Sequence, residues 1–221
     1  MRVLISGADG ALGSAVVGHF RASGHKVAAL MGVPSETPRG EGDFDSGNLS
    51  DEAAAKASVA RAVEWLGTPD AVVHLVGGFV WTEVLGTTLE TWRRMFEINV
   101  ATAVATVTAA VPLMADGGAV VLIGANSAQP AGLGFGPYGA SKSAVARFAE
   151  TMAAELKGRG IRVNAVLPQI IDTPANRADM PDVDPATWTS PKAIAEVLEF
   201  LASPASRAIN GASVPVGNAA I

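Results

Sequence analysis

The sequence predicts one α/β domain, residues 1–221, in which a doubly wound parallel sheet of about seven strands carries helices on both faces. Short apolar, β-branched runs alternate with longer amphipathic runs along the whole chain. Two of the short runs, 71–76 and 119–124, are almost continuously apolar, as expected of central parallel strands without a face in water. A length of 221 residues suits a single domain with a sizeable core.

The same alternation places each element along the chain. The predicted strands are 2–6, 26–30, 71–76, 119–124, 161–168 and 212–217, with a weaker candidate at 41–45. The predicted helices are 11–23, 51–66, 88–114, 139–157 and 190–202. Two irregular loops, 31–48 and 169–189, are long for a compact domain, and such loops are usually lids or binding loops.

Composition narrows the class of function. The net charge is −5 and there is no basic stripe, which argues against a nucleic-acid partner. The chain has no cysteine, so disulfides and thiolate metal sites are excluded. His19, His25 and His74 are scattered, which favours structural roles over metal binding, so we expect no metal.

The N-terminal sequence enters a strand directly, which leaves no room for a signal peptide. The weakly polar run from Val100 is short for a membrane span and contains threonines and Pro112. We therefore expect a soluble, cytoplasmic protein without a membrane partner. In that case the run is a helix buried on several sides.

A glycine turn connects the first strand to the first helix. Gly7, Gly10 and Gly13 are spaced three apart in "VLISGADGALGSAV". Such a turn lets the backbone approach a pyrophosphate, and the helix N-terminus supplies free N–H groups. The other residues of this predicted nucleotide-binding turn are Asp9, Ala11 and Leu12.

The end of the second strand bears on the choice between NAD and NADP. An acid there usually binds the adenosine ribose and favours NAD, but this chain has Met31. Arg39 could reach a 2′-phosphate, so the balance leans toward NADP while the choice stays open. Further along, Asn48 and Leu49 would flank the adenine, or Asn48 would simply cap the next helix.

The only tyrosine, Tyr138, precedes Lys142 by four positions. Two side chains with this spacing lie on one face of a helix. A free tyrosine has a pKa of about 10 and is a poor acid–base catalyst at neutral pH. A nearby ammonium favours the phenolate, so we expect Lys142 to lower the pKa of Tyr138.

Taken together, the glycine turn, "YGASK", the "INV" segment with Asn99 and the "NAVLPQIIDTP" segment resemble the short-chain dehydrogenase/reductase family over essentially the whole chain. The resemblance implies a Rossmann fold that transfers hydride between a nicotinamide cofactor and a small molecule. Tyr138 would donate or accept the proton, Lys142 would bind the nicotinamide ribose, and Asn99 would anchor a water. The cofactor would also meet Val76, Gly77, Gly78, Pro168, the Ile171 backbone and Thr173. Thr173 could instead be only a helix cap.

One family residue is missing. The usual serine lies thirteen positions before the tyrosine, where this chain has Ala125. Either Ser127 or Asn126 replaces its hydrogen bond from a shifted position, or the substrate does not need it. The segment "LPQIIDTPANRADMPDVDPATW" is similar to the dihydropteridine reductase branch, which has alanine at that position.

The branch resemblance implies an electron-poor quinonoid or imine-like heterocycle as substrate. Met180 and Trp188 would then close over a flat molecule, or they would merely anchor a surface loop. Two rival functions are a ketone or alcohol reductase that uses Ser127, and a non-catalytic NADP sensor. We also expect a homodimer or homotetramer that associates through 88–114 and 139–157.

Overall fold

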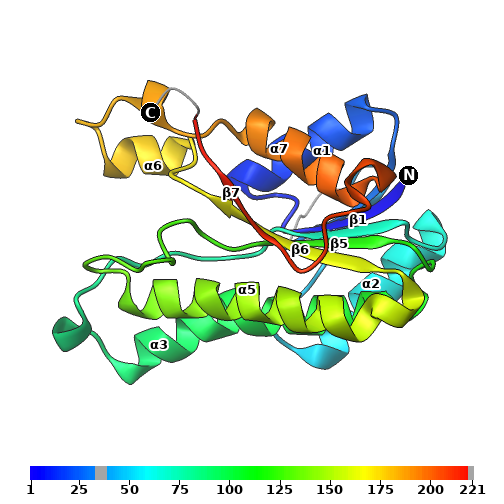
Figure 1. Ribbon diagram of the computed structural model, residues 1–221, viewed down its shortest axis with the longest axis horizontal. Coiled ribbons are helices and arrows are strands. Elements are labelled where there is room, and N and C mark those ends of the chain that lie inside the picture. The colour runs from blue at the N-terminus through cyan, green and yellow to red at the C-terminus, as the bar shows by residue number, and fades with distance from the viewer. Residues whose placement is uncertain (33–38, 219–221) are drawn as a thin grey trace.

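The computed structural model describes residues 1–32 and 39–218, and over this part of the chain seven strands form one parallel sheet (Figure 1). The spatial order is β3-β2-β1-β4-β5-β6-β7. The strands are β1 Arg2–Ser6, β2 Lys26–Met31, β3 Asp43–Asp45, β4 Ala71–His74, β5 Ala119–Ile123, β6 Arg162–Pro168 and β7 Ser213–Val216. The predicted fold class is confirmed, and the weak candidate at 41–45 is a real edge strand. Part of the predicted loop 31–48, namely 33–38, lies outside the described residues.

Helices cover both faces of the sheet. They are α1 Ala11–Ala22, α2 Glu52–Leu66, α3 Leu89–Phe96, α4 Thr102–Ala110, α5 Gly136–Glu155, α6 Pro174–Asp179 and α7 Pro191–Ala202. In Figure 1, α1 and α7 lie on one face, and α2, α3 and α5 lie on the other. Alternate strand residues supply the two cores: Leu4 and Val72 pack on the α2 side, Val3 and Val73 on the α1 side.

Several boundaries differ from those predicted. β4 ends at His74, because Leu75 and Val76 leave the sheet to line a cavity. α5 begins at Gly136, since Pro137 suits the first helical turn. The predicted helix 88–114 is divided by a π-helical segment at Glu97–Ala101 and ends in a 3₁₀ turn at Val111–Leu113.

The helical stretch Leu89–Leu113 is the single described segment that is long and apolar enough to cross a membrane, judged by length and composition only. In this fold it serves as a packing element: α4 packs against α2, and α3 packs against α5. A stretch of this composition is also typical of a core helix in a soluble protein.

The direction of the crossovers changes between β1 and β4, which lie side by side although β2 and β3 follow β1 in the chain. Ligands of open α/β sheets bind at the carboxyl ends of the strands at such a switch point. The short helix α6, which the sequence did not predict, projects beyond the sheet in Figure 1.

Candidate active site

A cavity of about 430 Å³ lies at this switch point. It is lined by Gly7, Asp9, Gly10, Gly32, Ser46, Gly47, Asn48, Leu49, Leu75, Val76, Gly77, Ile98 and Thr102. Seven of the predicted cofactor residues are therefore brought together: Gly7, Asp9, Gly10, Asn48, Leu49, Val76 and Gly77. The other predicted cofactor residues are not among those that line it: Ala11, Leu12, Gly13, Gly78, Tyr138, Lys142, Pro168, Ile171 and Thr173.

Three glycines shape the turn in different ways. Gly7 has a φ of 73°, and a Cβ there would fall 2.7 Å from the Val76 nitrogen. A Cβ on Gly13 would fall 1.9 Å from the Gly7 carbonyl oxygen, so helix α1 packs directly on the turn. Gly10 has ordinary space around a Cβ position and begins α1 without a side-chain cap. Its lack of a side chain therefore leaves the helix N-terminus accessible to an anion.

One end of the cavity, where the sequence predicts the adenine, is formed by residues after β2 and β3. Asn48 accepts hydrogen bonds from the Ser50 N–H at 3.0 Å and the Ser50 hydroxyl at 2.8 Å. The N-cap of α2 is Asp51, so the alternative in which Asn48 caps this helix is wrong. Gly32, Ser46 and Gly47 also line the cavity and were missed. Their position just beyond the ends of two predicted strands was the available signal.

Arg39, the residue that was predicted to reach a 2′-phosphate, lies beside Met31. Its guanidinium contacts the Met31 sulfur at 2.9 Å and donates to the Asp45 carboxylate at 2.6 Å. Met31 ends β2 and pairs in register with Asp45 of β3. A guanidinium is therefore present near the strand end that usually discriminates between the two dinucleotides.

A buried imidazole lies beneath the cavity. Thr102 donates its hydroxyl proton to the Ile98 carbonyl at 2.6 Å, so its oxygen accepts from His74 Nε2, 3.3 Å away. The other ring nitrogen, Nδ1, then accepts from the Ser6 hydroxyl at 2.7 Å. Burial, together with the charge of Lys142, lowers the pKa of His74 to about 3. His74 is therefore a neutral link between β1, β4 and α4.

Lys142 is buried on α5 and points under the end of β5. Its Nζ donates to the Ile123 carbonyl at 3.0 Å. A Cβ on Gly77 would fall 2.8 Å from both Lys142 Nζ and Asn99 Oδ1, so both groups lie against the backbone of the cavity wall. Burial lowers the pKa of Lys142 to about 8, which leaves the amine mostly protonated at neutral pH.

Asn99 holds the loop after β4 against α5. Its amide accepts from the Gly78 N–H at 2.9 Å and donates to the Gly78 carbonyl at 3.1 Å. It also donates to the Ser141 hydroxyl at 3.0 Å, and Ser141 donates to the Tyr138 carbonyl at 2.8 Å. Asn99 lies within the π-helical segment, where the helix widens. Asn99 thus contacts both the loop after β4 and helix α5.

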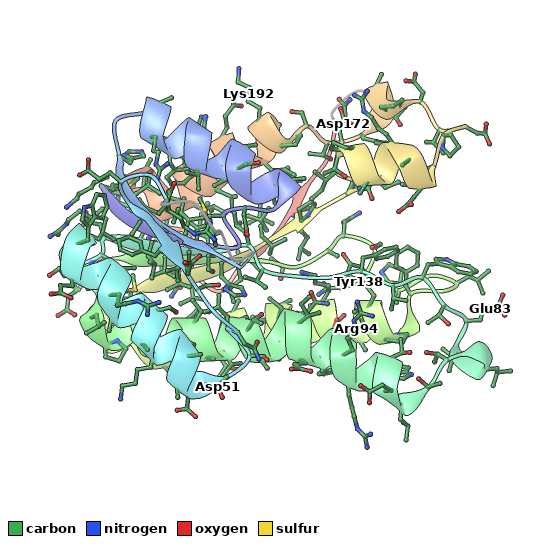
Figure 2. The ribbon with its side chains drawn as sticks, turned by 180° about the vertical axis from the view of Figure 1, so that it is seen from behind. Asp51, Glu83, Arg94, Tyr138, Asp172 and Lys192 are labelled. Carbon is green, nitrogen blue, oxygen red and sulfur yellow. The ribbon has the colours of Figure 1, made fainter. Side chains whose placement is uncertain are left out.

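Tyr138 lies in the first turn of α5, one turn before Lys142. In Figure 2, Tyr138 and Asp172 lie on opposite sides of the strand ends; Asp172 belongs to the loop that leads into α6. Burial raises the pKa of Tyr138 to about 12. The net shift is therefore opposite to the lowering that was expected from Lys142, because burial of the phenol is the dominant cause.

The turn after β5 contains the candidate replacements for the missing serine. Ala125 is buried, Asn126 is half-buried and Ser127 is exposed. The Asn126 N–H donates to the Pro168 carbonyl at 3.0 Å, which joins this turn to the end of β6.

In the loop 169–189, Thr173 caps α6 by accepting from the Asn176 N–H at 3.2 Å. The Asn176 side chain donates to the Ile171 carbonyl at 2.8 Å. Trp188 is only 5% exposed, so it anchors the loop and does not present its ring to the surface. Met180 is half-buried at the end of α6. Of the two proposed covers for a flat substrate, only Met180 is partly accessible.

Comparison with known proteins shows to which family the chain is similar. A family model described as enoyl-(acyl carrier protein) reductase matches residues 7–218. The (3R)-3-hydroxyacyl-CoA dehydrogenase of Rattus norvegicus is 31% identical over 96% of this chain and 93% of its own. The meso-2,3-butanediol dehydrogenase of Serratia marcescens is 29% identical over 99% and 93%. A blue fluorescent protein from a metagenomic library, solved with NADPH, superposes with a TM-score of 0.82 at 27% identity, covering 98% of this chain and 96% of its own.

The fold and the cavity at the switch point of its parallel sheet are those of the dinucleotide-binding class of α/β proteins. The chain belongs to the short-chain dehydrogenase/reductase family and is an NAD(P)-dependent enzyme. The relatives named above act, by name, on a diol and on a hydroxyacyl-CoA. The names of these relatives therefore do not confirm the resemblance to the dihydropteridine reductase branch.

Proposed function

We propose that this protein is a cytoplasmic, homo-oligomeric NADP(H)-linked reductase of an electron-poor conjugated ring, such as a quinonoid dihydropterin. The observation that carries the proposal is the position of the Lys142 amine, which lies against Gly77 in the wall of the cavity, one helical turn after Tyr138. The buried Ala125 supports the substrate class, because such a ring can accept hydride without a clamped carbonyl.

The residues present fit a dinucleotide. The exposed Gly10 leaves the N-terminus of α1 accessible to the phosphates, and Asn48 and Leu49 line the cavity where they would contact the adenine. The contact of Arg39 with Met31, at the end of β2, supports a role for Arg39 in binding a 2′-phosphate. An ammonium has three donors, one of which goes to Ile123, so Lys142 can also donate to a ribose hydroxyl.

The bound dinucleotide would supply the hydride, and the protein supplies the proton. In the reducing direction, the Tyr138 hydroxyl gives its proton to the heteroatom of the substrate, and the resulting phenolate later recovers a proton from solvent. Because burial raises the pKa of Tyr138 to about 12, the phenol remains protonated at neutral pH until it is used. The charge of Lys142 would stabilise the phenolate that forms.

The test is oxidation of NADH and NADPH in the presence of quinonoid dihydropterin, quinones, imines and ketones. We expect NADPH-dependent reduction of the dihydropterin and loss of turnover in Tyr138→Phe, with cofactor affinity nearly unchanged. NADPH binding without turnover of any acceptor would instead indicate a sensor.

The second candidate is a ketone or alcohol reductase, which the names of the relatives favour. Ser127 would then donate to the carbonyl oxygen. Turnover of simple ketones that is lost in Ser127→Ala and retained in Asn126→Ala would establish this alternative.

A further inference from the structure

Aromatic side chains from two loops surround Tyr138. The ring of Phe79 meets the Tyr138 ring edge-on, with centroids 4.9 Å apart and an interplanar angle of 82°. Phe135 lies 5.8 Å from Phe79 and 6.1 Å from Tyr138, again between centroids. Trp81 packs directly on Gly134, where a Cβ would fall 2.1 Å from the indole nitrogen. We call Phe79, Trp81 and Phe135 the aromatic wall.

The aromatic wall is held in place by backbone contacts. The Thr82 N–H donates to the Gly134 carbonyl at 2.9 Å, and Thr82 pairs in parallel with Phe135. The loop after β4 is thereby joined to the segment that leads into α5. Because these bonds do not involve a ligand, the rings are positioned before any substrate arrives.

The wall is accessible although it is apolar. Phe79 is 56% exposed and Trp81 is 53% exposed, beside a tyrosine whose hydroxyl is the proposed proton donor. Aromatic rings next to a few polar groups are typical of small-molecule sites. These exposed faces are therefore available to a flat partner.

Charge narrows the class of partner. No charged residue occurs in 75–82 or in 117–141, the two stretches that carry the wall. The loop 169–189 carries four aspartates and one arginine, Arg177, which is paired with Asp172 at 2.6 Å. The aromatic wall therefore offers no cation to a substrate with several phosphates, and the loop 169–189 carries more negative than positive charge.

We propose that the aromatic wall is the surface on which the substrate stacks, and that it selects a flat, uncharged ring over a polyanionic carrier-linked substrate. This inference rests on the proposed function and deepens it by naming the group that recognises the substrate. Trp81 is its most direct test, because it belongs to the wall and shows no ring contact with Tyr138 among the described residues.

The experiment compares Trp81→Ala with Leu85→Ala, a control on the same segment whose side chain is fully exposed. Three acceptors are used with NADPH: 1,4-naphthoquinone, butane-2,3-dione and acetoacetyl-CoA. We expect Trp81→Ala to raise KM for the naphthoquinone about tenfold with kcat nearly unchanged. KM for the dione should not change, and Leu85→Ala should resemble the wild type. Circular dichroism and gel filtration verify that each variant keeps its fold and size.

Preference of the wild type for acetoacetyl-CoA would overturn both this inference and the proposed reduction of a conjugated ring. Three other results would overturn the inference alone: an equal KM change for ring and dione, an unchanged KM for the ring, and a Trp81→Ala variant that changes oligomeric size but not KM. The last would make the wall a contact between copies of the chain. If the wild type binds NADPH but reduces none of the three acceptors or the dihydropterin, the proposed function and this inference both fail.

Discussion

The amine of Lys142 donates a hydrogen bond to the carbonyl oxygen of Ile123, 3.0 Å away, and so ties helix α5 to the last residue of β5. The bond holds a charged group where burial disfavours its charge and lowers its pKa to about 8. An unfolded lysine titrates near 10.4. Function and stability therefore oppose each other at this residue.

Lys142→Met should abolish turnover and raise the free energy of unfolding at pH 7, by roughly 2 kcal/mol once the lost hydrogen bond is subtracted. Between pH 8 and about 10.4 the unfolded wild type keeps a proton that the folded wild type releases, so wild-type stability rises with pH. The gap between the two proteins should narrow over that range. Urea unfolding at pH 7, 8.5 and 10 measures it, with the exposed Lys192→Met as control. A less stable Lys142→Met at pH 7 would contradict the prediction.

His74→Asn should reduce sensitivity to acid. The pKa of His74 is lowered to about 3 by burial and by the Lys142 charge, whereas an unfolded histidine titrates near 6.5. Its stabilising contribution is therefore complete above pH 6.5 and falls, by about 1.4 kcal/mol per pH unit, as the pH decreases toward 3. Chemical unfolding at pH 7, 6, 5 and 4 should give a shallower decline for the variant. Parallel declines would show that His74 does not titrate on unfolding.

Gly10→Ala should weaken cofactor binding without unfolding the protein. A methyl group fits there, 3.5 Å from the Gly7 carbonyl oxygen, but it would stand at the N-terminus of α1 where the phosphates are expected. We expect the Kd for NADPH to rise about tenfold. Gly18→Ala is the matched control: it lies on the exposed face of the same helix, and should only raise stability, by about 0.5–1 kcal/mol. Equal Kd values for both variants would exclude the glycine turn as the phosphate site.

Asn99→Ala should lower the free energy of unfolding by about 2–3 kcal/mol, because it leaves the Gly78 backbone and the Ser141 hydroxyl without their partner. Ser141→Ala removes the bond from Asn99 and the bond to the Tyr138 carbonyl, and should cost about 1–2 kcal/mol. Since both variants break the Asn99–Ser141 bond, the double variant should lose less than the sum. Strict additivity in urea unfolding would show that the two residues act independently.

Arg39→Leu should raise KM for NADPH by roughly tenfold and leave KM for NADH nearly unchanged, because only NADPH carries a 2′-phosphate for the guanidinium. Arg21→Leu serves as control, since Arg21 pairs with Asp43 at the other end of β3. Steady-state kinetics with both dinucleotides decides the outcome. Equal effects on the two cofactors would assign Arg39 to the structure of the strand end instead.

Short stretches of sequence were sufficient to predict the elements that depend on nearby residues. Continuous apolar runs predicted the central strands, since a strand covered on both faces has no polar positions. The glycine turn was predictable because close packing at Gly7 and Gly13 excludes any side chain. The spacing of Tyr138 and Lys142 placed both on one helix, although not in the electrostatic relationship that was expected.

Groups whose behaviour depends on distant neighbours were decided by the tertiary structure. In the sequence, His74 was only an isolated histidine within an apolar strand. The packing of β1 and α4 against β4 supplies Ser6 and Thr102 as its hydrogen-bond partners. Phe79 and Phe135 are far apart in sequence and meet around Tyr138 because the two loops pair. Sequence alone determined the fold class, the glycine turn and the placement of Tyr138 and Lys142 one turn apart on the same helix. The protonation of that pair depends on burial, and burial exists only once segments from the whole chain have packed together.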